Sequence, residues 1–132
     1  MEKIRESIVI NRPVRQVFTF TLDPENTPKW IGGITMEQRN ESPTKLGTIY
    51  KNQNSKGTWK EYEITKFIPD STFVFSRKGA SYHVQYTFKA LAGNQCELEY
   101  CEWDESGDAS ELFDHASLKE VLTTLKNVIE SQ

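Results

Sequence analysis

The spacing of hydrophobic residues predicts one strand and then two helical pieces at the start of the chain. Residues 3–11 alternate as a β-strand that places Ile4, Ile8 and Ile10 on one face. A helix follows from residue 13, because proline is favoured in a first helical turn, and its apolar stripe is Val14, Val17, Phe18 and Leu22. Asp-Pro at 23–24 and Thr-Pro at 27–28 interrupt it, and a short piece around residue 30 ends at two glycines.

Between residues 34 and 101 the period changes to two, which predicts six further strands. They cover residues 34–37, 47–52, 58–68, 72–77, 82–88 and 96–101. The clearest alternation sends four large side chains to one face, namely Tyr82, Val84, Tyr86 and Phe88. Short polar turns join most of these strands, so the sheet is expected to be antiparallel with one buried face.

Apolar residues return to a spacing of three and four at the C-terminal end. This predicts a helix of about five turns from about Ser110 to Glu130, with Asp108 and Glu111 resembling a capping box. Its stripe includes Leu122 and Leu125, which we expect to face the sheet. The prediction for residues 1–132 is therefore a single α+β domain, in which a curved sheet of six to seven strands wraps around the long helix and leaves a void between them.

Composition and charge exclude several classes of function. The chain has 132 residues, a net charge of −3 and 16 scattered basic residues, which argues against binding to a nucleic-acid backbone. No apolar run approaches the length of a membrane span, and the N-terminus lacks the apolar segment of a secretion signal. We therefore expect a cytoplasmic protein with no integral membrane association, present as a monomer or weak homodimer.

The cysteines and histidines argue against a disulfide and against a metal site. Cys96 and Cys101 lie five positions apart in one predicted strand, roughly 16–17 Å along it, which is too far for a disulfide. The two histidines, His83 and His115, do not combine with them in a zinc-binding spacing. No phosphate-binding or dinucleotide-binding glycine motif is present, so we expect no metal and no cofactor.

Four motifs follow one another in an order that points to a known superfamily. They are I-x-I-x-x-P-V-x-x-V-F at 8–18, D-P followed by W at 23–30, I-T-x-F-x-P at 64–69 and Y-x-F at 86–88. This order resembles the START-related superfamily, also called SRPBCC or birch-pollen-allergen-like, and within it the polyketide cyclase/dehydrase and lipid-transport group. The resemblance spans nearly the whole chain and implies a helix-grip fold. It also implies a role as a carrier of lipids or sterols, as a hormone receptor or as an aromatase/cyclase.

The inward-facing positions of the last strands are the candidate ligand-binding residues. We expect a cavity between the sheet and the C-terminal helix, lined by Phe73, Phe75, Val84, Tyr86, Leu98 and Tyr100. Arg77 shares the face of the two phenylalanines and either binds a ligand oxygen or reaches solvent at the strand end. The resemblance places Trp30 near the cavity mouth, where it acts either as a lid or as a core anchor.

Catalytic residues cannot be assigned from this pattern. Glu6 shares a face with the isoleucines of the first strand and is either a buried acid or an edge residue open to water. His83 falls on the predicted solvent face, and His115 flanks the stripe of the C-terminal helix. The leading interpretation is therefore binding or carriage of a small hydrophobic molecule such as a lipid, polyketide or sterol-like compound.

Two alternatives stay open. A cyclase or dehydratase would require ionisable groups that converge inside the cavity. A protein-interaction module would have a filled interior and an exposed apolar patch.

Overall fold

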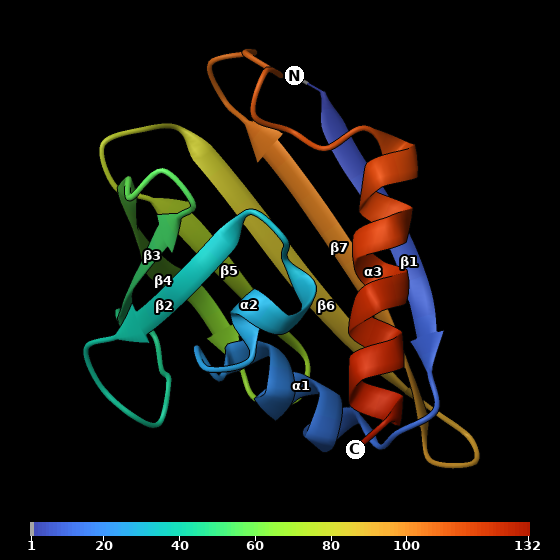
Figure 1. Ribbon diagram of the computed structural model, residues 1–132. Coiled ribbons are helices and arrows are strands. Elements are labelled where there is room, and N and C mark those ends of the chain that lie inside the picture. Colours follow the sequence, from blue (N-terminus) through green and yellow to red (C-terminus); the bar gives the residue numbers. More distant parts are fainter. Residues whose placement is uncertain (1) are drawn as a thin grey trace.

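Seven strands form one continuous antiparallel sheet in the computed structural model, which describes residues 2–132 (Figure 1). The order across the sheet is β1-β7-β6-β5-β4-β3-β2, so every neighbouring pair except β1 and β7 is consecutive in sequence. The strands are β1 Lys3–Ile10, β2 Ile34–Arg39, β3 Ile49–Asn54, β4 Trp59–Ile68, β5 Thr72–Arg77, β6 Tyr82–Leu91 and β7 Gln95–Asp104. The predicted α+β class, the sheet and its hairpin connections are confirmed.

Two short helices follow β1, as the prolines predict. They are α1 Val14–Leu22 and α2 Thr27–Trp30, and both lie against the concave side of the sheet (Figure 1). Pro13 is the residue just before the first helical turn of α1. The hydroxyl of Tyr50 on β3 donates to the carbonyl oxygen of Leu22 at 2.6 Å, which ties the end of α1 to the far side of the sheet.

The C-terminal helix begins later than the sequence pattern suggests. Helix α3 runs from His115 to Glu130, and Asp114 caps it by accepting a hydrogen bond from the backbone N–H of Ser117 at 2.7 Å. The predicted start near residue 110 and the capping box at Asp108 were wrong. Asp108 instead accepts a hydrogen bond from the Ser110 N–H within the irregular segment that precedes the helix.

The long helix covers only one side of the concave face. In Figure 1, α3 lies in front of β1 and β7, whereas α1 and α2 lie across the lower part of the central strands. The helix buries one stripe, which consists of Leu118, Leu122, Leu125 and Ile129. The predicted orientation of the stripe is therefore correct.

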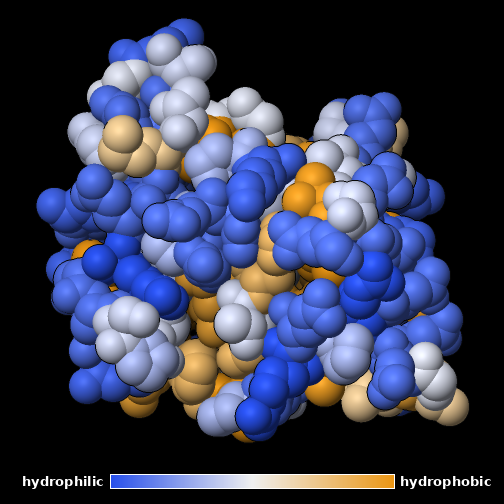
Figure 2. All heavy atoms as spheres, turned by 60° about the horizontal axis from the view of Figure 1, so that its bottom comes forward, coloured by the Kyte–Doolittle hydropathy of each residue, from blue (hydrophilic) through white to orange (hydrophobic). Residues whose placement is uncertain are grey.

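Aromatic residues fill the end of the sheet under α1. Phe18 packs edge-on against three rings, those of Phe67, Phe73 and Phe88, with centroids 5.2–5.7 Å apart. Seen with this end brought forward, the surface is mostly hydrophilic, and hydrophobic residues form a band between polar side chains (Figure 2).

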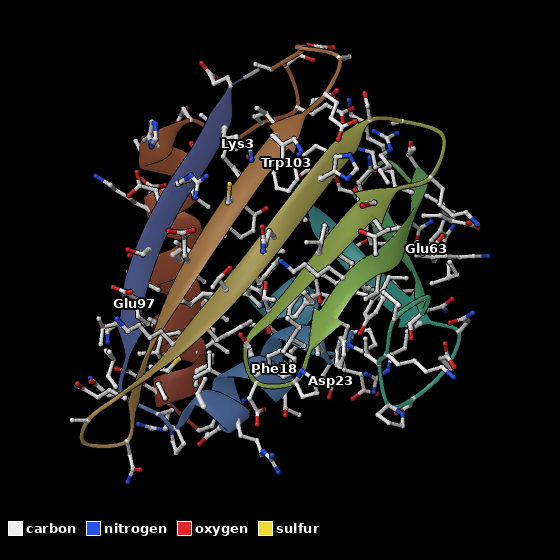
Figure 3. The ribbon with its side chains drawn as sticks, turned by 180° about the vertical axis from the view of Figure 1, so that it is seen from behind. Lys3, Phe18, Asp23, Glu63, Glu97 and Trp103 are labelled. Atoms are coloured by element: carbon white, nitrogen blue, oxygen red, sulfur yellow. The ribbon has the colours of Figure 1, made fainter. Side chains whose placement is uncertain are left out.

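The convex face of the sheet is polar and carries no helix (Figure 3). His83 lies on this face, as predicted, where its ring stacks on Trp103 at 5.3 Å and its Nδ1 lies 2.7 Å from the hydroxyl of Ser76. The ammonium of Lys3 lies 4.6 Å from the centre of the same indole ring. Both cysteines, Cys96 and Cys101, are buried and free, in agreement with the distance argument.

The packing of α3 leads to a test by truncation of a core side chain. Leu125 has no exposed surface, so Leu125→Ala should lower the free energy of unfolding by about 2–5 kcal/mol. Thr124→Ala on the exposed side of the same helix is the control, and it should change stability by less than about 0.5 kcal/mol. Urea denaturation measures both. Equal losses would contradict the docking of the helix.

Candidate functional site

A cavity of about 340 Å³ opens on the concave side of the sheet. Its walls come from six of the strands, β2 to β7, from the α1–α2 region and from the segment before α3. The lining residues are Thr21, Thr27, Ile31, Gly33, Ile34, Glu37, Asn52, Asn54, Thr58, Lys60, Tyr62, Phe75, Tyr82, Val84, Tyr86, Tyr100, Glu102, Glu111 and Phe113. A space of this size suits a small organic molecule.

The cavity lies beside the C-terminal helix and not under it, which corrects the predicted location. No residue of His115–Glu130 contributes to the lining. The helix is docked on the β1 and β7 side, and its fully buried leucines close that part of the concave face. The open part is bounded instead by α2, by residues 31–34 and by residues 111–113.

Half of the predicted ligand-binding residues line this cavity. Phe75, Val84, Tyr86 and Tyr100 all contribute to its wall. The register of the sheet explains this grouping, because Phe75 is paired with Val84 across β5 and β6, and Tyr86 is paired with Tyr100 across β6 and β7. Alternation on three adjacent strands was thus a sufficient signal for these four positions.

The other predicted residues lie outside the lining. Phe73 and Leu98 have no exposed surface and belong to the packed core. Trp30 is buried and packs edge-on against Tyr86, a residue of the cavity wall, with ring centroids 6.2 Å apart. Arg77 is turned to the rim, where its guanidinium donates to Glu111 at 2.8 Å.

Glu37 is a carboxyl group in the cavity wall that is not among the residues predicted from the sequence. It accepts a hydrogen bond from the Thr27 hydroxyl at 2.5 Å and a longer one from the Asn52 amide at 3.4 Å. Its half-buried side chain borders the cavity, while the surrounding protein excludes most of the bulk water. This burial raises the pKa of Glu37 to about 7, and the two hydrogen bonds oppose the rise.

A bulge in β2 explains why periodicity alone missed Glu37. Strict alternation from Ile34 would place Met36 on the inner face and Glu37 on the outer face. The register shifts between Ile34 and Met36, so Ile34 and Glu37 share the cavity side, whereas Met36 is exposed. No motif in the sequence marks this bulge.

Glu102 is a second carboxyl group in the wall, on the opposite side of the curled sheet from β2. It has no exposed surface and accepts hydrogen bonds of 2.5 Å from the Tyr82 hydroxyl and from the backbone N–H of Phe113. Burial raises its pKa, and these hydrogen bonds oppose the rise. Glu102 continues the alternation of the inward residues of β7, so this position was readable from the sequence.

Aromatic rings occupy much of the wall between the two carboxyl groups. They are Tyr62, Phe75, Tyr82, Tyr86, Tyr100 and Phe113. Burial raises the pKa of Tyr62 to about 12 and raises those of Tyr82, Tyr86 and Tyr100 well above the ordinary value. The phenols therefore stay neutral at physiological pH, and those whose hydroxyl is not already engaged, as that of Tyr82 is with Glu102, can donate a hydrogen bond to a ligand oxygen.

Charged residues at the rim neutralise one another. Glu111 forms ion pairs with Arg77 at 2.8 Å and with Lys60 at 3.9 Å. The capping role predicted for Glu111 is replaced by this rim position. Of the two alternatives given for Glu6, the structure has the edge position: Glu6 lies on edge strand β1 with a partly exposed side chain, and it pairs with His115 Nδ1 at 2.6 Å, away from the cavity lining.

The chemistry that this wall offers is hydrogen bonding and proton exchange. Across residues 2–132 no group of three or more histidine, cysteine or acidic side chains is arranged to hold a metal ion. Neither histidine borders the cavity. The carboxyl groups inside the cavity that could exchange a proton with a bound molecule are Glu37 and Glu102, whereas Glu111 and Lys60 pair with each other at the rim.

The fold and cavity define a helix-grip protein, and the sequence places it in a family. The family described as "Polyketide cyclase / dehydrase and lipid transport" matches residues 1–130. The chain belongs to this family, which confirms the resemblance drawn from the motifs. No curated protein matches the sequence.

Solved structures share the fold at low sequence identity. The chain is similar to protein MLL2253 from Mesorhizobium loti (TM-score 0.78, 10% identity, covering 99% of this chain and 98% of that one). It is also similar to Aha1 from Colwellia psychrerythraea, solved as a dimer (TM-score 0.73, 16% identity, 98% and 97%). A third neighbour is the di-domain ARO/CYC BexL (TM-score 0.75, 13% identity, 98% and 47%).

Among the helices in residues 2–132, none combines the length and the apolar character needed to cross a bilayer.

The hydrogen bonds of Glu102 can be tested by removing one hydroxyl group. Tyr82→Phe leaves the buried carboxyl with one donor fewer, so it should lower the free energy of unfolding by about 1.5–3 kcal/mol. Because Glu102 also accepts from Phe113 N–H, amide hydrogen exchange at residue 113 should become faster in this variant. An unchanged exchange rate together with a loss below about 0.5 kcal/mol would show that the hydroxyl contributes nothing to this arrangement.

The raised pKa of Glu37 predicts a specific pH dependence of stability. Between its ordinary pKa of 4.5 and about 7, the folded protein holds a proton that the unfolded chain has released. Stability from this group is therefore complete below pH 4.5 and is lost as the pH rises through 7. Glu37→Gln should show a smaller loss between these values than the wild type, measured by denaturation at each pH. Parallel profiles for the two proteins would contradict the assignment.

Proposed function

We propose that this protein binds a small, largely apolar molecule with oxygen functions in the cavity beside α3. The observation that carries the proposal is the cavity itself, with about 340 Å³ of open space in an otherwise packed interior. Aromatic rings supply apolar contact area, and buried phenol and carboxyl groups supply hydrogen bonds that orient the ligand.

The family description supports this choice of ligand class. It names polyketide cyclases, dehydrases and lipid transport, and these functions share an oxygenated hydrophobic ligand. The neighbouring ARO/CYC structure shares the fold with this chain. In a cavity of this size, a mono- or bicyclic compound or a short acyl chain is a better match than a whole phospholipid.

A second candidate is an enzyme of the cyclase or dehydratase type, and one observation favours it. Two ionisable groups, Glu37 and Glu102, converge on the same cavity, and proton transfer by a positioned carboxyl group is the chemistry such reactions need. The interaction-module alternative receives less support, because its expected filled interior differs from the cavity found here. The Aha1 neighbour was solved as a dimer, and formation of such a dimer by this chain would not conflict with ligand binding in the cavity.

The proposal is tested by blocking the cavity. Val84 lies in the wall on β6, so Val84→Phe adds a ring that fills part of the space. We expect the wild type to bind the neutral apolar dye N-phenyl-1-naphthylamine with enhanced fluorescence, and Val84→Phe to bind it at least about tenfold more weakly, a loss of about 1.4 kcal/mol.

Lys89→Phe is the matched control, because it places the same ring at an exposed position of the same strand. It should bind the dye as the wild type does. Native mass spectrometry of gently purified protein would show whether a small molecule is retained. If the wild type neither binds the dye nor retains a molecule, or if Lys89→Phe loses the dye equally, the proposal fails.

A further inference from the structure

The charges around the cavity are unbalanced in a way that the proposed function does not explain. Three carboxyl groups border it, from Glu37, Glu102 and Glu111, against one ammonium group, from Lys60. Lys60 and the nearby Arg77 are both engaged by Glu111 at the rim. The two inner carboxyl groups therefore have no cationic partner from the rim.

Glu37 is the inner carboxyl group that is available to a ligand. Within residues 2–132, no lysine, arginine or histidine forms an ion pair with it, and its partners are the neutral Thr27 and Asn52. Glu102 differs, because it already holds both Tyr82 and the backbone of Phe113 at 2.5 Å. A buried carboxylate without a cation is costly, and a charged ligand would remove that cost.

The groups around Glu37 are mostly aromatic or neutral. Thr27 comes from α2, and three strands supply Tyr50 and Asn52 on β3, Lys60 and Tyr62 on β4 and Tyr86 on β6. Arg39, two residues along β2, is a second nearby cation, and its guanidinium donates to the hydroxyls of Thr44 and Ser42. Phenol faces attract organic cations through the negative charge of the ring face. A carboxyl group surrounded by such rings is the arrangement that recognises a protonated amine.

We propose that the cavity is selective for an apolar molecule that carries a protonated amine, with the ammonium group bound at Glu37 and the apolar body against the tyrosine-lined wall. This inference rests on the proposed function, since it specifies the ligand class of the same cavity. Lys60 does not oppose it, because its ammonium is directed to Glu111 at the rim. Glu37 then acts as the residue that determines specificity.

The proposal has a proton-linkage consequence. With its pKa raised to about 7, Glu37 is partly protonated at pH 7 in the empty protein. A cation beside the carboxyl group favours its charged form, so the pKa falls on binding and the proton leaves. Binding of an amine should therefore release a fraction of a proton from this residue at pH 7, whereas a neutral ligand should release none.

The experiment compares two probes of nearly equal shape, 1-naphthylmethylamine and 1-naphthalenemethanol, by isothermal titration calorimetry at pH 7. The amine is protonated at this pH, and the alcohol is neutral. We expect the wild type to bind the amine about tenfold more tightly than the alcohol, which corresponds to about 1.4 kcal/mol. Titrations in two buffers of different ionisation enthalpy should reveal proton release with the amine alone.

Two variants complete the test. Glu37→Gln keeps the shape of the side chain but removes its charge, so it should abolish the proton release and the amine preference, and the two probes should then bind within about twofold of each other. Glu63→Gln makes the same charge change on β4 without touching the cavity lining (Figure 3), and it should behave as the wild type. Circular dichroism confirms that each variant is folded.

The outcomes separate this inference from the proposed function. If the alcohol binds as tightly as the amine, or if Glu37→Gln weakens both probes equally, the amine selectivity is wrong while the binding cavity stands. If neither probe binds and the neutral dye also fails, the proposed function is wrong, and the amine selectivity falls with it.

Discussion

The structure depends on a mismatch of area: a curled sheet of seven strands presents more inner surface than one four-turn helix can cover. Helix α3 spans 16 residues, about 24 Å, and is about 10 Å wide. It buries its leucine stripe on the β1 and β7 side. The rest of the concave face must be covered by other parts of the chain or remain open to a ligand. The short helices and the segment before α3 cover some of it, and the cavity is what remains.

Each wall of the cavity is held by contacts that also build the fold. Phe18 of α1 is enclosed by rings of β4, β5 and β6, so α1 and the helix after it have a fixed position on the sheet. Thr27 of α2 reaches Glu37 on the edge strand. On the other side, Glu102 holds the backbone of Phe113 and thereby the segment that leads into α3. Several side chains that face the ligand space therefore also make the hydrogen bonds that stabilise the fold. Substitutions at these positions should change ligand binding and stability together.

The two inner carboxyl groups illustrate how partners set different roles for one residue type. Glu102 is fully buried and accepts two short hydrogen bonds, which fix the position of its carboxyl group. Glu37 accepts one short and one long hydrogen bond, and its side chain borders the cavity. Burial raises the pKa of both, but only Glu37 retains capacity for a further partner. The amine selectivity that we propose depends on this difference in hydrogen bonding. A ligand competes poorly for a carboxyl group whose oxygens already accept short hydrogen bonds.

The sequence by itself determined the elements, the antiparallel sheet, the stripe of α3 and four residues of the cavity, because period two and period three-to-four are local properties that packing on one face enforces. Glu102 was equally readable as the next inward position after Tyr100. The tertiary structure alone decided three other matters. The bulge in β2 turned Glu37 inward. The irregular path of residues 108–114 moved the helix start and brought Glu111 to the rim. The docking of the helices on parts of the concave face left Phe73, against Phe18 of α1, and Leu98 in the packed core, while Tyr86 and Tyr100 border open space. These outcomes depend on which distant surfaces meet, and no spacing along the chain encodes that.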